Sequence, residues 1–289
     1  MQAKSKLYAR RLRGDIGPLN IDPASRLPGR IFGPAVSLDG VYQDYDEISL
    51  IKHFTLGSRM VVDERVFHYG RAGNALNCGL GAHIGGAQDV AFAVVTVDLL
   101  AAGKYTFEVT IAGTDGRLGT GVIAEDELAE GNAIIFPDGM GDTINRRIVH
   151  NTAVDPNLVP PVVLMTVTVD RPLPVALTPA PHAELIANRY LDVLEGNLDR
   201  QMIVGMPPIA ATVGQYLWLQ TWGLVWITPV LGDWTTIDSS LAMFRGNGSI
   251  AAFNEADPAV GIQQIAGTIM APGFGGGQGA PFVNLMIAP

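Results

Sequence analysis

Two histidines and the single cysteine are the residues of this sequence with the clearest potential for chemistry. His68, Cys78 and His83 lie close together in the chain, and imidazole and thiolate groups are common ligands of zinc. Asp63 or Asp89 could supply a fourth ligand. Because the spacing matches no standard closed zinc site, we interpret them as a buried thiol with two ordinary histidines and expect no bound metal.

The remaining motifs each lack a required part. Residues 79–85 resemble a dinucleotide-binding loop, but the third glycine is one residue late and no βαβ unit surrounds it. The acidic residues 125–130 and 138–142 lack the ligand order of an EF-hand. Ser249 has no nucleophile elbow around it, and residues 273–279 lack the lysine and hydroxyl of a P-loop. We therefore expect no catalytic residue and no cofactor, and predict that the protein is not an enzyme.

The elements that would position these residues are mainly strands. Apolar residues alternate with polar ones over 105–111, which is typical of a strand with one exposed face. Three hairpins are predicted, pairing 90–99 with 105–111, 132–136 with 143–149, and 215–221 with 224–228 around Trp222 and Gly223. Further strands are expected at 162–169, 260–270 and 282–287, and short helices at 45–54, 73–82 and 183–194.

Composition agrees with a folded β-rich chain. Hydrophobic residues make up 48% of the 289 residues, and 34 glycines and 19 prolines favour turns over helices. No apolar segment follows the basic N-terminus, so a signal peptide is not expected. The uncharged residues 201–232 are interrupted by Pro207, Pro208 and Pro229, which favours buried strands over a membrane span.

Charge divides the chain into an arm and a body. Residues 1–30 hold seven basic and two acidic residues, whereas the remainder holds 12 basic and 26 acidic ones. We predict an extended basic arm over 1–30 and a β-rich body over 31–289, made of one or two packed β subdomains. The arm has no aromatic side chain beyond Tyr8 and the body would repel phosphates, so nucleic acid is not the expected partner. The arginines expected to contact a binding partner or a neighbouring subunit are Arg10, Arg11, Arg13, Arg26 and Arg30.

Four tryptophans cluster between positions 218 and 234. Large aromatic side chains at this density are usual in cores and in subunit interfaces. We predict that Trp218, Trp222 and Trp226 form an oligomer interface, while a platform for stacking sugars is the alternative.

Several segments, taken in order, resemble the capsid decoration or cement proteins of tailed bacteriophages. The segment that carries most of the resemblance is Tyr-Leu-Trp-Leu-Gln-Thr-Trp-Gly at 216–223. Arg189 stands where many relatives carry proline, and the arm has no counterpart in the family. The resemblance covers about residue 65 to the C-terminus and rests on segments 67–73, 75–79, 126–136, 138–142, 171–177, 188–190 and 214–223.

This resemblance implies an all-β protein with a β-sandwich or jelly-roll-like body, few short helices and no active site. It further implies a homotrimer on the outer capsid surface of a virion, with the major capsid protein as partner and no membrane or nucleic acid bound. Two alternatives remain open. One is a β-sandwich carbohydrate-binding module whose tryptophans and acidic loops line a groove, and the other is a structural protein of the phage tail.

Overall fold

The computed structural model describes residues 37–85, 89–94, 101–137, 143–159, 161–177, 181–196, 202–229, 240–253, 264–271 and 281–289. These residues are all-β, as predicted, and contain no helix. The chain divides into two compact units. Unit 1 combines residues 1–85 with 190–289, and unit 2 is the stretch 86–189 between them. The predicted arm, residues 1–30, lies outside the described residues.

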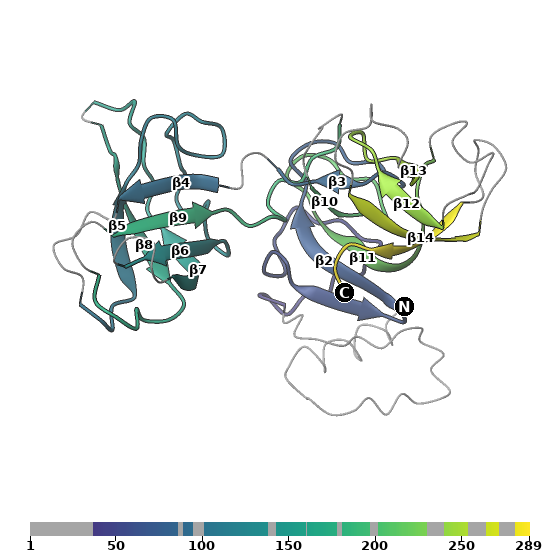
Figure 1. The fold of residues 1–289 in the computed structure, drawn as a ribbon, viewed down its shortest axis with the longest axis horizontal. Coiled ribbons are helices and arrows are strands. Elements are labelled where there is room, and N and C mark those ends of the chain that lie inside the picture. Colours follow the sequence, from purple (N-terminus) through teal and green to yellow (C-terminus); the bar gives the residue numbers. More distant parts are fainter. Residues whose placement is uncertain are drawn as a thin grey trace. The chain divides into compact units, whose positions relative to one another are not determined.

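Unit 1 is built on a seven-stranded antiparallel sheet (Figure 1). The strand order is β1-β2-β11-β15-β14-β12-β13, and a separate two-stranded ladder pairs β10 with β3. The C-terminal strands β14 and β15 pair as neighbours and carry two of the strands predicted from the sequence. The bounds are β1 Arg59–Val62, β2 Arg65–Arg71, β3 Ala82–His83, β10 Ile203–Gly205, β11 Tyr216–Trp226, β12 Leu241–Phe244, β13 Ile250–Ala252, β14 Ile265–Ala271 and β15 Phe282–Met286.

Strand β11 corrects one of the predicted hairpins. Residues 216–226 form one continuous strand, whereas the sequence suggested two strands reversing at Trp222 and Gly223. The register shifts between Gln220 and Trp222, and Gly223 has a φ of +90°. The buried Gln220 Nε2 donates to the carbonyls of Trp222 and Leu224, both at 3.1 Å. A bulge with a permissive glycine therefore bends the strand without reversing it, so that β11 pairs first with β2 and then with β15.

Two apolar clusters fill unit 1. In the first, the rings of Phe54 and Tyr69 lie 5.0 and 4.9 Å from the ring of Trp218, at tilted to edge-on angles. Such angled pairs are the favoured arrangement of aromatic side chains. The second cluster lies under β12, β14 and β15 and includes Phe244 and Leu285. Both clusters use residues far apart in the sequence.

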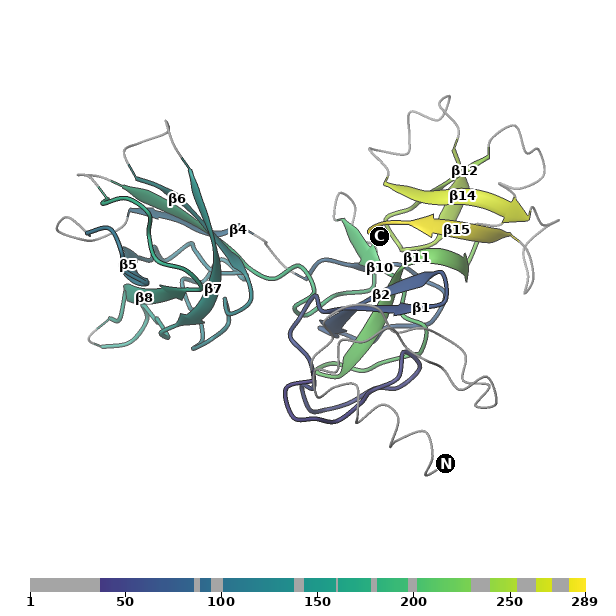
Figure 2. The same cartoon turned by 90° about the horizontal axis from the view of Figure 1, so that it is seen from below.

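Unit 2 is a six-stranded antiparallel sheet in the order β4-β9-β6-β7-β8-β5. Although β4 and β5 stand at opposite ends of this order, they contact each other. The sheet therefore curls over its own core, in a sandwich-like arrangement that can be followed in Figure 2. Its strands are β4 Asp89–Val94, β5 Thr106–Thr110, β6 Asn132–Phe136, β7 Ile144–Asn151, β8 Leu164–Val169 and β9 His182–Ile186.

The pairing within unit 2 confirms one predicted hairpin and corrects another. Strands β6 and β7 are antiparallel neighbours, as the sequence predicted. The expected hairpin of 90–99 with 105–111 does not form, because β4 pairs with β9 and β5 pairs with β8. Both β4 and β5 carry closely spaced apolar residues, and adjacency in sequence does not reveal which of several such strands will pair.

The three predicted helices are also corrected. Residues 183–186 belong to β9, and 45–54 and 73–82 form turns and isolated bridges. Ser49 bridges to Tyr216, and Leu76 bridges to Ala211. Short segments without caps form marginal helices, so hydrogen bonds to distant strands decide their conformation. Among the described residues no helix is long and apolar enough to span a membrane.

Candidate functional site

One face of the β11–β15 ladder carries a row of large apolar side chains. Trp222 lies opposite Met286, and Trp226 lies opposite Phe282. Because residues directly opposite in an antiparallel pair point to the same side, these four side chains share one face. Leu224, between the two tryptophans, belongs to the same face. The opposite face carries the core residues Val283 and Leu285.

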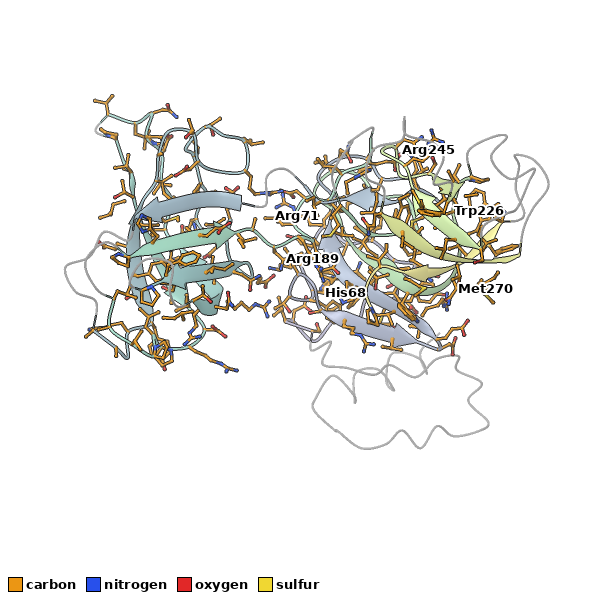
Figure 3. All side chains as sticks on the ribbon, in the orientation of Figure 1. His68, Arg71, Arg189, Trp226, Arg245 and Met270 are labelled. Carbon is orange, nitrogen blue, oxygen red and sulfur yellow. The ribbon has the colours of Figure 1, made fainter. Side chains whose placement is uncertain are left out.

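Several side chains of this face are open to solvent. Leu224 is 45% exposed, Met286 43% and Phe282 38%. Met270 on the neighbouring strand β14 is 63% exposed and is labelled with Trp226 in Figure 3. Trp222 and Trp226 are each partly buried. We call Trp222, Leu224, Trp226, Met270, Phe282 and Met286 the apolar face.

Trp218 does not belong to this face, which corrects its predicted place in an oligomer interface. Its side chain is fully buried among Phe54 and Tyr69 in the core of its own unit. Its indole N–H donates to the carbonyl of Gln43 at 3.0 Å. Trp218 therefore stabilises the fold and is inaccessible to a neighbouring chain. The interface roles of Trp222 and Trp226 stay a prediction.

The structure describes the two histidines and the cysteine that were considered, and rejected, as zinc ligands, but not the arginines predicted to make contacts from the arm. Arg10, Arg11, Arg13, Arg26 and Arg30 lie outside the described residues. His68 is buried in β2, where its ring stacks on Tyr190 at 5.3 Å and its Nδ1 lies 3.1 Å from the Thr221 hydroxyl. His83 is buried in β3. Cys78 is exposed, so the interpretation of its thiol as buried is wrong. Within the described residues no three His, Cys, Asp or Glu side chains are grouped so as to hold a metal.

The other motifs have structural roles where they can be seen. Asp126 has a φ of +60° and accepts a hydrogen bond from His150. Ser249 is buried in the turn between β12 and β13, and its hydroxyl donates to Asn247 at 2.6 Å. Residues 138–142 and 273–279 all lie outside the described part of the chain.

A chain of three polar side chains that the sequence analysis missed lies in the segment leading to β1. The Nδ1 of His53 is 2.6 Å from Oδ2 of Asp39, and its Nε2 is 3.0 Å from the hydroxyl of Ser49. His53 is only 8% exposed. This is the order of atoms found in Ser–His–Asp catalytic triads. We call Asp39, Ser49 and His53 the hydroxyl–imidazole–carboxylate chain.

Each member of this chain is held by further contacts. Oδ1 of Asp39 accepts from the hydroxyl of Ser37 at 2.7 Å and from the N–H of Val41 at 3.0 Å. Burial raises the pKa of the Asp39 carboxyl, but these hydrogen bonds and the neighbouring His53 outweigh it and lower the pKa to about 2. Asp39 is therefore ionised at neutral pH.

The backbone around His53 is tied to the aromatic core. The N–H of His53 donates to the hydroxyl of Tyr69 at 3.2 Å, and that hydroxyl donates to Oε1 of Gln43 at 2.8 Å. Burial raises the pKa of Tyr69, which keeps its hydroxyl protonated as a donor. Gln43 in turn accepts the indole N–H of Trp218. Hydrogen bonds therefore connect the hydroxyl–imidazole–carboxylate chain to the buried aromatic core of unit 1.

Only a weak sequence signal marks this arrangement. Ser49 and His53 are four residues apart, and Asp39 precedes His53 by fourteen. This spacing matches no catalytic motif, because nucleophile, base and carboxylate are brought together by tertiary folding and not by a fixed sequence pattern.

Comparison with known proteins gives no match: no protein-family model, no curated protein and no solved structure matches the chain. The resemblance to capsid decoration proteins therefore stays a prediction.

Proposed function

We propose that this protein is a structural component of a tailed-bacteriophage virion that binds the outer surface of the capsid shell as an oligomer. It binds the major capsid protein, and it assembles with two further copies of itself into a homotrimer. The ordered sequence segments between about residue 65 and the C-terminus support this proposal, and so does the all-β architecture.

The observation that carries the proposal is the apolar face. Leu224, Phe282 and Met286 share one side of the β11–β15 ladder with Trp222 and Trp226, and each is between 38% and 45% exposed. Exposed apolar side chains gathered on one surface often mark a contact with a macromolecule. Large aromatic side chains and methionine are also enriched in such interfaces.

Charge supplies a second argument. The arm carries an excess of five positive charges, and the remainder of the chain is strongly acidic. Arginine pairs with carboxylates through two parallel hydrogen bonds, so the arm suits an acidic shell or the acidic body of the next copy. Several weak contacts made by a tethered arm add avidity to the contact made by the apolar face.

The test has two parts. Quantitative mass spectrometry of purified virions gives the copy number of each of their proteins, and a binding assay measures the affinity of the purified protein for emptied capsid shells. The proposal expects copies in the hundreds, a ratio to the major capsid protein set by the shell lattice, and saturable binding to shells. A few copies per virion would identify a tail component instead. Binding to a glycan array without binding to shells would favour the carbohydrate-binding alternative.

A further inference from the structure

We propose that Ser49 is a nucleophile activated by His53 and Asp39, and that it hydrolyses neutral esters with an apolar acyl group. This activity goes beyond the proposed structural role. It also departs from the sequence-based expectation that no residue of the protein is catalytic.

The geometry assigns a role to each atom of the hydroxyl–imidazole–carboxylate chain. The Asp39 carboxylate accepts the Nδ1–H of His53 at 2.6 Å, which leaves Nε2 unprotonated and directed at the Ser49 hydroxyl at 3.0 Å. In this tautomer the imidazole is a general base for the serine. The carboxylate stabilises the imidazolium that forms when the proton is transferred, and the low pKa of Asp39, about 2, keeps it charged for that purpose.

The nucleophile is positioned by its backbone. Ser49 and Tyr216 exchange two hydrogen bonds, with the Ser49 N–H donating at 3.0 Å and the Tyr216 N–H donating at 2.7 Å. The N–H of Ile51 donates to the Ser49 hydroxyl oxygen at 3.0 Å. These contacts hold the serine on the edge of β11, so the reactive oxygen needs no large rearrangement before attack.

A donor for the developing oxyanion is also present. Within the described part of the chain, the N–H of Leu50 donates no hydrogen bond to the protein. The N–H of the residue after the nucleophile is a common oxyanion donor in serine hydrolases, and loss of one such donor typically lowers kcat by about 10²–10³-fold. Leu50 is therefore assigned as the oxyanion donor.

The reaction balances with water and ester alone. The Ser49 oxygen attacks the ester carbon while its proton passes to Nε2 of His53. The bond from that carbon to the alkoxy group then breaks, and the departing alcohol takes the proton from Nε2. Water attacks the acyl-serine, gives its proton to His53, and the carboxylic acid leaves as the serine regains a proton.

The surroundings of Ser49 select the substrate class. Leu50 is 76% exposed, Ile51 64% and Ile48 38%, so the segment on either side of Ser49 offers apolar side chains to solvent. Asp46 and Glu47, just before this segment, are exposed carboxylates that disfavour an anionic substrate. A neutral ester with an aliphatic acyl chain fits both features.

The experiment is labelling of the full-length protein with a fluorophosphonate probe, followed by peptide mapping. Attack by Ser49 forms an oxygen–phosphorus bond, the phosphorus–fluorine bond breaks, and the hydroxyl proton passes to His53. We expect labelling at Ser49, none at that position in Ser49→Ala, and a rate reduced at least 100-fold in His53→Gln, the usual contribution of a general base. Asp39→Asn should slow labelling at least tenfold. Turnover of 4-nitrophenyl butyrate should follow the same order.

Controls separate chemistry from folding. The hydroxyl of Ser58 is hydrogen-bonded to that of Thr55 at 2.7 Å, and Ser58 does not belong to the hydroxyl–imidazole–carboxylate chain. Ser49 of the Ser58→Ala variant should therefore be labelled at the wild-type rate. Near-ultraviolet circular dichroism verifies that each variant is folded. If His53→Gln does not fold, the labelling rate of Ser49 in the wild type is compared with the rate in Asp39→Asn and in urea-denatured wild type.

The proposal is overturned if Ser49 of the folded wild type is labelled no faster than Ser49 of the denatured protein, or if the wild type and Asp39→Asn are labelled at equal rates. Either result would show that the three side chains have a purely structural role. Shell binding is measured separately, so failure here leaves the proposed structural function standing.

Discussion

Gly79 lies directly against the indole of Trp226, so that a β-carbon at Gly79 would come within 2.7 Å of the ring. Gly79 also has a φ of +87°, which side-chain-bearing residues rarely adopt. The N–H of Thr228 donates to the Gly79 carbonyl at 2.8 Å, which fixes the segment beside the end of β11. The loop before β3 thus determines how Trp226 is presented on the apolar face.

Replacing Gly79 by alanine should therefore destabilise unit 1 by about 2–4 kcal/mol, from backbone strain and from the contact with Trp226. Gly214→Ala is the matched control, because Gly214 has a similar φ of +82° with open space around its position. It should cost only the backbone strain of the left-handed conformation, about 1–2 kcal/mol. Urea unfolding followed by tryptophan fluorescence measures both. Equal losses would show that the Trp226 contact contributes nothing.

The two faces of the β11–β15 ladder should respond differently to the same substitution. Leu285→Ala opens a cavity in the core and should cost about 2–5 kcal/mol. Leu224→Ala removes a side chain that is 45% exposed and should change the free energy of unfolding by about 0.5 kcal/mol or less. If the apolar face binds a partner, Leu224→Ala should still weaken oligomerisation or shell binding. Light scattering and shell co-sedimentation provide those readouts, and unchanged values in both would exclude Leu224 from any interface.

Acid should weaken the segment around Asp39. The carboxyl has a pKa of about 2 in the folded protein and about 3.9 when unfolded. The lowered pKa means that ionised Asp39 contributes stability above about pH 4, and that this contribution is lost as the pH falls toward 2. Asp39→Asn lacks it at every pH. The difference in stability between wild type and Asp39→Asn, measured by denaturant titration, should therefore shrink between pH 5 and pH 2.5. A constant difference would contradict this assignment.

Removing residues 1–30 should leave folding and oligomerisation intact but weaken binding to shells. The contacts of a basic arm are electrostatic, so the loss should be largest at low salt and small at about 1 M, where the Debye length falls to about 3 Å. Replacing the five arm arginines by lysine keeps the charge but removes paired hydrogen bonds, and should give an intermediate affinity. Shell binding by the truncated protein as tight as that of the full chain at physiological salt would show that the arm makes no contact.

Local patterns in the sequence were enough to predict the fold class and several strands. The alternation at 105–111 correctly placed Phe107 and Val109 inside, although Tyr105 of the same pattern is 51% exposed. The turn-forming residues after Phe136 correctly indicated the β6–β7 hairpin. Both predictions depend only on residues that are close in sequence, because the period of apolar side chains indicates a strand and the residue types between two strands indicate a turn.

Long-range pairing was decided only by the tertiary structure. The run around Trp222 and Gly223 could be a hairpin or a bulged strand, and the choice depends on β2 and β15, from distant parts of the chain. The same folding buries Trp218 while leaving Leu224 exposed, although both lie on one strand. It also brings Asp39 and Ser49 to opposite nitrogens of His53. The sequence by itself therefore determined an all-β chain whose first 30 residues are basic. Which side chains meet depended on register and loop closure, because these are set by the free energy of the whole packed unit and not by local preference.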